Sequence, residues 1–279
     1  MSVKGKSARL LDPLVPQKGK IIKIVDETPD IKTFYITTDE GKPFSPAPGQ
    51  LAMLSLFNVG EAMFSVTSQG EEHLEFSIKK TGVLTDALHE VDEGQVIGIR
   101  GPYGNGFPLE MLKGKDILFI AGGIGLAPVR SLINFCVHSR QDYGDLQLVY
   151  GSRTPEDLCF KEDLFSRWPQ GGINVDVTVD RGDEGWKGHV GFVPAYLEEL
   201  SPVPVGKIVV VCGPPIMIKL VMQSLDKMQY DHEQIITTLE KRMKCGIGKC
   251  GRCNMGSVYI CLDGPVFTMS QLDCMPAEL

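Results

Sequence analysis

The sequence lacks a long hydrophobic run, an excess of basic residues and an apolar segment at its beginning. No uninterrupted apolar stretch reaches the ~18–20 residues of a membrane-spanning helix, and the first residues contain no signal-peptide core. The 28 basic and 35 acidic residues give a net charge of −7 at pH 7, so no basic surplus is available to neutralise nucleic-acid phosphates. We therefore expect a soluble cytoplasmic protein with no nucleic-acid partner and no direct membrane insertion.

The composition is otherwise that of a globular protein with about two domains. The chain has 279 residues, of which 43% are hydrophobic and 23% charged, so a substantial core is available. Its eight cysteines do not form a disulfide framework in a chain of this size, which fits a reducing compartment. Four of them are dispersed, three of these in apolar or mixed segments where buried thiols are common: Cys136, Cys159, Cys212 and Cys274.

The other four cysteines form a metal-site pattern. Cys245, Cys250, Cys253 and Cys261 are separated by four, two and seven residues, and thiolates this close repel one another unless a metal neutralises them. Four-then-two spacing is typical of plant-type 2Fe–2S ferredoxins, although the fourth cysteine is closer here than in a ferredoxin. The glycines between the cysteines let the backbone approach a cluster and donate N–H bonds to its sulfides.

The alternative to an iron–sulfur cluster is a structural zinc site. Zinc sites usually place two cysteine knuckles of two-residue spacing on either side of a longer gap. A four-residue loop such as 245–250 instead wraps around an inorganic cluster. The spacing therefore favours iron–sulfur and leaves zinc as the second interpretation.

Residues 19–110 have the pattern of a small antiparallel β-barrel. Short β-like segments alternate there with Gly/Pro turn signals, and one helical stretch at 83–91 interrupts them. The predicted strands are 21–25, 31–37, 51–57, 63–67, 74–78 and 96–100.

Residues 111–240 alternate strand and helix, which predicts a parallel, doubly wound α/β sheet covered on both faces. Residues 1–18 are expected to be a loosely ordered lead-in, and 241–279 to follow the sheet as an appendage that carries the cysteines. The predicted strands are 117–121, 146–150, 175–179, 207–212 and 234–239, and the predicted helices 126–138, 156–168, 193–200 and 216–228.

Two turns of the α/β region are candidate dinucleotide sites. Gly122-Gly-Ile-Gly125 follows a strand and opens a helix, so its backbone approaches a pyrophosphate whose charge the helix N-terminus stabilises. Cys212-Gly-Pro214 is a second strand-to-helix turn, with Cys212 at the carboxyl end of its strand, where ligands of open α/β sheets bind. A tight structural turn is the alternative for each.

Two loops of the barrel region are further candidates. Thr85 follows Gly82 in the first turn of a helix, where its hydroxyl and the backbone N–H groups would hold a phosphate or simply cap the helix. The loop at 100–106 would brace a ring system or be a glycine-rich turn.

The order of these motifs resembles that of ferredoxin–NADP reductase-like flavoproteins. The cysteine segment and Asp263-Gly-Pro-Val-Phe267 narrow the resemblance to one branch, which contains the sulfhydrogenase gamma subunit, a subunit of anaerobic sulfite reductase and the dihydroorotate dehydrogenase electron-transfer subunit. The resemblance spans residues 18–271 and is carried by 63–66, 82–85, 101–104, 122–128, 150–153 and 212–215.

This resemblance implies FAD in the barrel, NAD(H) or NADP(H) in the sheet domain and a 2Fe–2S cluster held by the four cysteines. The residues expected at the flavin ring are Met63, Phe64, Ser65 and Val66. Those expected at the ribityl chain and pyrophosphate are Ile78, Lys79, Lys80, Gly82, Leu84 and Thr85. Those expected at the dinucleotide are Gly122, Gly123, Ile124, Gly125, Ala127, Pro128, Gly151, Ser152, Arg153, Asp180, Cys212, Gly213 and Pro214, with Cys212 near the nicotinamide.

The chain departs from the family pattern at one position. Many of these reductases have Arg-x-Tyr-Ser where this sequence has Ala62-Met-Phe-Ser65. Without the arginine FAD loses a charge-assisted phosphate contact, and we expect Lys79 or Lys80 to substitute for it.

A second position, Asp180, predicts which dinucleotide the chain prefers. Asp180 follows a strand near where the adenosine ribose would lie, and a carboxylate there accepts hydrogen bonds from a free 2′-hydroxyl and repels a 2′-phosphate. Arg153 and Arg181 instead favour the 2′-phosphate of NADPH. The balance favours NADH.

The resemblance implies an electron-transfer subunit that passes electrons between the dinucleotide, FAD and the cluster to or from a redox partner subunit, itself iron–sulfur, in a hetero-oligomer. A flavin converts a two-electron carrier into one-electron steps, so no catalytic side chain is expected. A stand-alone reductase of a ferredoxin and a non-enzymatic, zinc-stabilised binding module are the alternatives.

Two sets of charged or titratable residues are open to more than one interpretation. Basic residues around the cysteines either offset the thiolates in a solvated loop or form a docking patch for an acidic partner: Lys241, Arg242, Lys244, Lys249 and Arg252. The histidines are dispersed and are expected at surface or loop positions: His73, His89, His138, His189 and His232.

Overall fold

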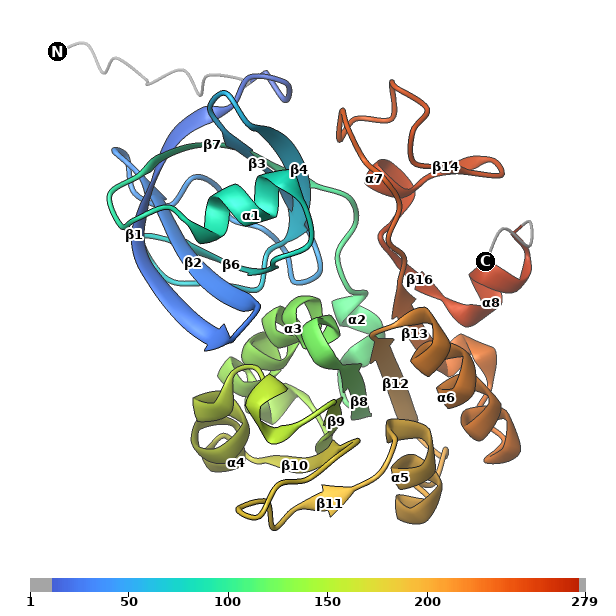
Figure 1. The fold of residues 1–279 in the computed structure, drawn as a ribbon. Helices are drawn as coiled ribbons and strands as arrows, with labels where there is room; N and C mark the ends of the chain where they lie inside the picture. The colour runs from blue at the N-terminus through green and yellow to red at the C-terminus, as the bar shows by residue number, and fades with distance from the viewer. Residues whose placement is uncertain (1–11, 276–279) are drawn as a thin grey trace, which may run out of the picture.

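The computed structural model describes residues 12–275, which form two sheets and a cysteine-bearing segment (Figure 1). The first sheet is antiparallel, in the order β4-β3-β7-β1-β2-β6-β5, and β4 also contacts β6, so the sheet curls toward a barrel. Helix α1 (Val83–His89) packs against β3 and β4. The strands are β1 (Gln17–Thr28), β2 (Ile31–Thr38), β3 (Leu51–Leu56), β4 (Gly60–Ser65), β5 (Ser68–Gln69), β6 (Leu74–Lys79) and β7 (Val96–Tyr103).

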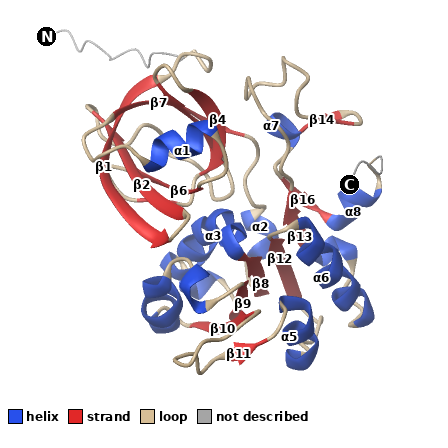
Figure 2. Cartoon of the chain, viewed as in Figure 1, coloured by secondary structure: helices blue, strands red, loops and turns tan. Residues whose placement is uncertain are grey.

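The second sheet is parallel except at one edge, in the order β11-β10-β9-β8-β12-β13-β16 (Figure 2). Chain order reverses between β8 and β12, where the carboxyl ends of strands in a doubly wound sheet leave a crevice for ligands. The strands are β8 (Asp116–Gly122), β9 (Leu146–Ser152), β10 (Ile173–Val179), β11 (His189–Val190), β12 (Lys207–Cys212), β13 (Ile235–Thr238) and β16 (Val266–Thr268).

Both faces of this sheet are covered because its strands are apolar on both sides. Along β8, Phe119 and Ala121 join the core under α3 (Leu126–His138), whereas Leu118 and Ile120 join the core under α5 (Val193–Leu200) and α6 (Pro215–Lys227). Alternate side chains of a strand point to opposite faces, so a continuous apolar run is what a sheet between two helical layers requires. Among the described residues no helix has the length and apolar character needed to cross a bilayer.

The helix expected at 156–168 is interrupted. Pro155–Asp157 form a 3₁₀ turn, residues 158–160 are not helical, and a helix resumes at 161 with a π-helical turn at Asp163–Arg167 before α4 (Trp168–Gln170). The N–H of Cys159 donates to the Tyr150 hydroxyl at 3.2 Å and that of Phe160 to Glu27 of the barrel at 2.9 Å. These tertiary bonds replace the helical ones.

The cysteine segment is not an appendage as expected. It leaves the sheet after β13 and returns as β16, which pairs antiparallel with β13. Between them lie a hairpin of β14 (Asn254–Met255) and β15 (Val258–Tyr259) and the short helix α7 (Ile260–Asp263), followed after β16 by α8 (Met269–Asp273). The segment has its own core, which includes Cys253, Ile260, Cys261, Phe267 and Leu272.

Strand β1 begins at Gln17, inside the expected lead-in, because Gln17 and Lys18 pair with β7; residues 1–11 of that lead-in lie outside the described residues. His89 is buried, and its Nε2 hydrogen-bonds with the Ile78 carbonyl at 2.8 Å, so it is not a surface residue. The dispersed cysteines Cys136, Cys159 and Cys212 are buried, and Cys274 is exposed.

One buried arginine joins the two sheet domains. Arg130 of α3 is 5% exposed; its Nη1 lies 2.6 Å from Glu75 of β6, and its Nε lies 2.6 Å from Asp163. Burial disfavours the charge, but the two carboxylates outweigh it and raise the pKa of Arg130. The two domains are thus joined by a buried contact between an arginine and two acidic side chains.

Arg130→Ala is expected to lower the free energy of unfolding by about 3–5 kcal/mol, because it removes the buried guanidinium that two buried carboxylates share. Asp163 then keeps only the largely exposed Arg167, at 2.9 Å, as a counter-charge. Lys113→Ala is the matched control: it removes an exposed pair with Glu110, which contributes at most about 1 kcal/mol. Urea denaturation of the holoprotein measures both. Equal losses in the two variants would contradict a special role for the buried contact.

Candidate functional site

Two glycine turns meet at the switch point of the parallel sheet. A Cβ on Gly125 would lie 2.6 Å from the Cys212 carbonyl oxygen and 2.6 Å from the Gly213 Cα, so only glycine lets the two backbones touch. The Tyr150 hydroxyl, buried beneath them, donates to the Gly123 carbonyl at 3.2 Å. The turns that the sequence indicated separately therefore form one continuous surface at the carboxyl ends of β8, β9 and β12.

A cavity of about 650 Å³ opens on this surface and extends to the barrel. The barrel contributes Asp30, Ile31 and Lys79, so the cavity lies between the two domains. The expected cofactor residues that line it are Lys79, Gly122, Gly123, Ile124, Gly125, Gly151, Ser152, Arg153, Asp180, Cys212, Gly213 and Pro214.

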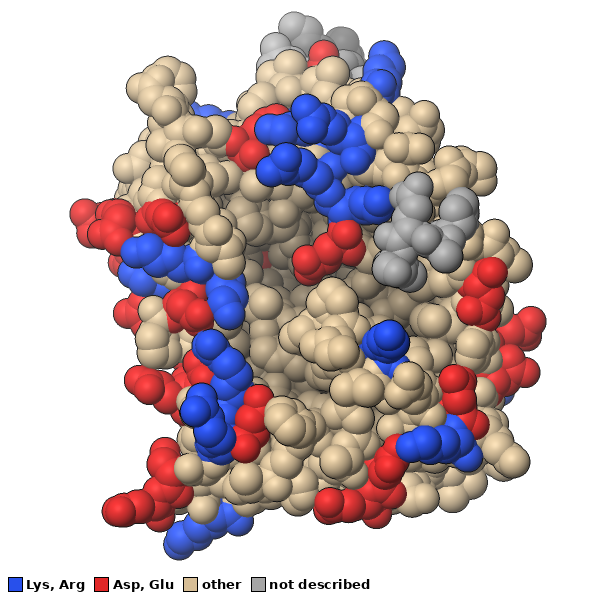
Figure 3. Space-filling model, turned by 45° about the vertical axis from the view of Figure 1, so that its right-hand side comes forward, with Lys and Arg blue, Asp and Glu red and all other residues tan. Residues whose placement is uncertain are grey.

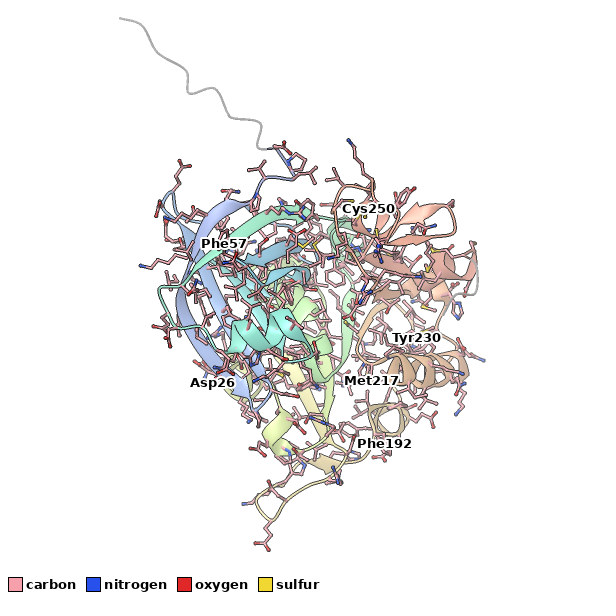
Figure 4. The ribbon with its side chains drawn as sticks, turned by 45° about the horizontal axis from the view of Figure 1, so that its top comes forward. Asp26, Phe57, Phe192, Met217, Tyr230 and Cys250 are labelled. Carbon is pink, nitrogen blue, oxygen red and sulfur yellow. The ribbon has the colours of Figure 1, made fainter. Side chains whose placement is uncertain are left out.

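Several lining residues were not found from the sequence. Asp30 forms an ion pair with Lys79 at 3.3 Å. This ion pair depends on contact between strands that the sequence does not reveal. Glu240 lies after β13 beside the Cys212 turn. An apolar wall comes from Phe192, Ile216, Met217 and Leu220; Phe192 and Ile216 are 66% and 65% exposed, and Figure 4 shows Phe192 and Met217 on the sheet domain, away from Cys250.

The polar end of the cavity carries charges of both signs. Arg153 donates to Asp157 at 3.0 Å and lies 3.9 Å from Asp30, which already neutralise it. Asp180 is exposed; burial raises its pKa, and the nearby Arg181 and Arg153 oppose that rise. A carboxylate without a close ion pair is therefore available at this end.

Cys212 is a neutral thiol. Burial raises its pKa to about 12, and its Sγ lies 3.0 Å from the Thr238 hydroxyl. It is not a nucleophile at neutral pH, because the thiolate is the reactive form. A small uncharged group at the end of a strand suits the contact of a flat ring with the sheet.

The expected flavin residues are only partly brought together. Lys79 faces the cavity, whereas Lys80 pairs at 3.1 Å with Glu90, the residue after α1, and does not line the cavity. Met63, Phe64 and Ser65 are half-buried on the edge strand β4; Val66 and Ile78 belong to the barrel core.

The α1 turn is already capped. The Thr85 hydroxyl accepts hydrogen bonds from the N–H groups of Thr81 and Gly82 at 2.8 and 2.9 Å. Gly82 has open space where a Cβ would stand, and Leu84 is half-buried. Ala127 and Pro128 lie in the first turn of α3, behind the glycines that line the cavity.

The four cysteines of the C-terminal segment lie together in two pairs. Cys245 lies beside Cys250, and Cys253 lies beside Cys261, close enough for each neighbour to affect the other's pKa. Among residues 12–275, no group of three or more Cys, His, Asp or Glu side chains is arranged to hold a single metal ion. Two irons in a 2Fe–2S cluster share four cysteines in pairs, and the observed pairing fits that requirement.

Backbone N–H groups point at these sulfurs. Gly248 donates to Cys261 Sγ at 3.2 Å, and Lys249 donates to Cys245 Sγ at 3.3 Å. Burial raises the pKa of Cys245, but the N–H groups around it outweigh burial and lower that pKa to about 6. Gly246 and Gly248 have φ of +79° and +69°, which lets the loop turn its amides inward. The donor set fits an iron–sulfur cluster.

The loop after β7 contacts the cysteine segment. The Gly104 N–H donates to the Cys261 carbonyl at 3.1 Å, and the Asn105 side chain donates to the Val266 carbonyl at 2.8 Å. The Tyr103 ring lies so close beneath Gly246 that a Cβ there would be 2.9 Å from it. Met63, expected at the flavin, packs into the same contact.

Comparison with known proteins identifies these two parts. Residues 119–223 match the oxidoreductase NAD-binding domain family, and 240–273 match the iron-sulfur cluster binding domain of dihydroorotate dehydrogenase B. The sulfhydrogenase 1 subunit gamma of Pyrococcus furiosus is 35% identical over 280 residues, covering 96% of each chain. A probable dihydroorotate dehydrogenase B (NAD(+)) electron transfer subunit of Methanocaldococcus jannaschii is 34% identical over 251 residues, covering 89% of this chain and 88% of its own. The chain belongs to the family of electron-transfer subunits that contains these two relatives.

The likeness to solved structures shows the fold of this chain. A chain of an NADH-dependent reduced ferredoxin-NADP oxidoreductase, described in connection with flavin-based electron bifurcation, has a TM-score of 0.76 at 23% identity, covering 90% of this chain and 88% of that one. The findings confirm the family, the fold class and the oxidoreductase function predicted from the sequence, and the cofactor set of NAD(P)H, FAD and iron–sulfur cluster agrees with them.

Gly125→Ala is expected to weaken dinucleotide binding and to cost about 1–3 kcal/mol of stability, because the new methyl group forces the touching turns apart. Gly185→Ala, in an exposed loop where the Cβ makes ordinary contact, is the control and should leave both quantities near wild type. Isothermal titration with NADH and thermal unfolding measure them. Unchanged affinity in Gly125→Ala would contradict the assignment of this turn.

Proposed function

We propose that this chain is the diaphorase subunit of a larger redox complex. NADH binds in the cavity between the domains, and FAD binds on the barrel side of the same cavity. FAD, when bound, accepts a hydride and releases its two electrons singly. The four cysteines would hold a 2Fe–2S cluster, which would supply the one-electron chemistry needed for transfer to a partner subunit. The observation that carries the proposal is that the cavity, the barrel and the paired cysteines adjoin one another in a single chain.

The proposed pose of the dinucleotide follows from the charges in the cavity. The pyrophosphate lies on the turn from Gly122 to Gly125, where α3 begins, because a helix N-terminus with open backbone favours an anion. The nicotinamide lies against Cys212. The adenosine ribose lies near Asp180, whose carboxylate accepts from a 2′-hydroxyl and repels a 2′-phosphate, so NADH is preferred to NADPH.

The partner is proposed from the relatives and from the surface. Both relatives named above are subunits of larger enzymes. Figure 3 shows a group of Lys and Arg side chains along the rim of a hollow on one face. The cysteine segment contributes exposed Arg242, Lys244, Lys249 and Arg252 beside the exposed Cys250. We infer an acidic docking surface on an iron–sulfur partner in the cytoplasm.

Iron, flavin and subunit analysis of the anaerobically purified native protein tests the proposal. We expect about two irons per chain, one flavin, bleaching by NADH, and co-elution with a partner chain. A colourless protein that contains zinc and does not reduce dyes with NADH would instead support a zinc-stabilised binding module. Elution of an active, iron-loaded chain by itself would support a stand-alone reductase.

Cys245→Ser is expected to remove the cluster signal and to lower the rate at which NADH reduces one-electron acceptors at least tenfold, while reduction of the flavin by NADH persists. The control is Cys274→Ser, which changes an exposed cysteine outside the two pairs. Stopped-flow absorbance separates the two steps. A cluster that survives Cys245→Ser unchanged would contradict the ligand assignment.

Asp180→Asn is expected to lower kcat/KM for NADH by roughly tenfold and to raise it for NADPH, because a hydrogen bond to a charged group contributes about 1.5–3 kcal/mol. Asp183→Asn, an exposed acid of the same loop that does not line the cavity, should leave the ratio of the two constants near wild type. Equal shifts in the two variants would place the ribose elsewhere.

A further inference from the structure

Arg100, on β7 of the barrel, is a buried cation that reaches into the cysteine segment. Arg100 is 5% exposed. Nη1 donates to the carbonyl of Cys245 at 2.8 Å, and Nη2 donates to the carbonyl of Lys244 at 2.9 Å. A buried guanidinium is costly unless its donors are satisfied, and here two of the acceptors are main-chain oxygens at a cluster ligand.

The remaining partners of Arg100 hold it in this direction. Nη1 also donates to the Tyr103 hydroxyl at 2.8 Å, and Nη2 also donates to Glu61 at 3.1 Å. The Tyr103 hydroxyl in turn donates to the Pro13 carbonyl. An arginine guanidinium stays protonated in proteins. The group is therefore a permanent, oriented positive charge.

The two charges of the Arg100–Glu61 pair do not cancel at the cysteines. The side chain of Glu61 is 35% exposed, whereas that of Arg100 is 5% exposed. Water screens the carboxylate more than the guanidinium. Arg100 also bonds directly to the residue that carries a thiolate, and Glu61 does not. A net positive potential remains at Cys245.

Such a potential has a consequence for an iron–sulfur centre. Adding one electron to a cluster adds one negative charge, so a nearby fixed cation stabilises the reduced form and raises the reduction potential. The bonds to the two carbonyls also fix the Cys245 loop to β7, and β7 pairs with both β1 and β3 inside the barrel. Charge and geometry act through the same side chain.

We propose that Arg100 is the residue that positions the cluster against the flavin barrel and sets its reduction potential. This inference rests on the proposed function, since it requires that the four cysteines hold a 2Fe–2S cluster. Arg100 acts through Cys245 and touches no reacting atom, so it is a positioning residue.

An EPR-monitored redox titration of the holoprotein tests the charge. Arg100→Gln is expected to lower the ratio of reduced to oxidised cluster at a fixed ambient potential about tenfold, which is 59 mV for a one-electron couple. Glu61→Gln is expected to shift the ratio in the opposite direction, because it removes the opposing charge and leaves Arg100 in place. A structural defect alone would not produce shifts of opposite sign.

Two further variants separate geometry from charge. Arg100→Lys keeps the charge and loses the paired bonds to the two carbonyls, so the potential should stay closer to wild type while electron transfer from flavin to cluster slows severalfold in stopped-flow traces. Arg252→Gln is the control. It removes an exposed charge from the same segment, where solvent screening makes the expected shift much smaller than that of Arg100→Gln.

The outcomes are distinguishable. An iron-loaded wild type with potentials that do not move in Arg100→Gln and Glu61→Gln overturns this inference and leaves the proposed function standing. A wild type without iron overturns both. Loss of the cluster in Arg100→Gln, with its retention in Arg252→Gln, supports the positioning role, and Glu61→Gln then decides the role of the charge.

Discussion

The contact of β7 and its following loop with the cysteine segment is the interaction on which the arrangement of the molecule depends. Arg100 holds the Cys245 carbonyl and Gly104 holds the Cys261 carbonyl, so both ends of the cysteine run are bonded to the barrel. Because β7 lies inside the barrel sheet between β3 and β1, it cannot shift without breaking strand pairing. The metal-binding segment is therefore joined to the barrel through space and to the sheet through β16.

The interface between the barrel and the parallel sheet domain also depends on a buried arginine. A single buried cation, Arg130, joins α3 to β6, and the cavity for the dinucleotide opens where the carboxyl edge of the sheet faces Asp30 and Lys79 of the barrel. Electron transfer needs its carriers close together and shielded from water. Rigid polar contacts between the parts satisfy that need better than flexible linkers, because they fix distance as well as order.

Sequence patterns predicted well those features whose cause is local. The strand-to-helix turn at 122–125 and the apolar strands follow from what a few neighbouring residues allow, and the cysteine spacing predicted an iron–sulfur segment where residues 240–273 match such a domain. Prediction was wrong where a distant partner decided the outcome. Residues 158–160 are not helical because the N–H groups of Cys159 and Phe160 donate to Tyr150 and Glu27. His89 is buried because its ring nitrogen forms a hydrogen bond with the Ile78 carbonyl.

The sequence by itself determined the family, the order of the domains and the metal chemistry, since thiol spacing and strand periodicity are written in consecutive residues. Only the tertiary structure decided which lysine faces the cavity, which loop supports the cysteines and that the tail rejoins the sheet. Those choices depend on backbone atoms of residues far apart in the chain, such as Arg100 and Cys245. A main-chain carbonyl is present at every position, so no residue type marks the one that a buried arginine will bind.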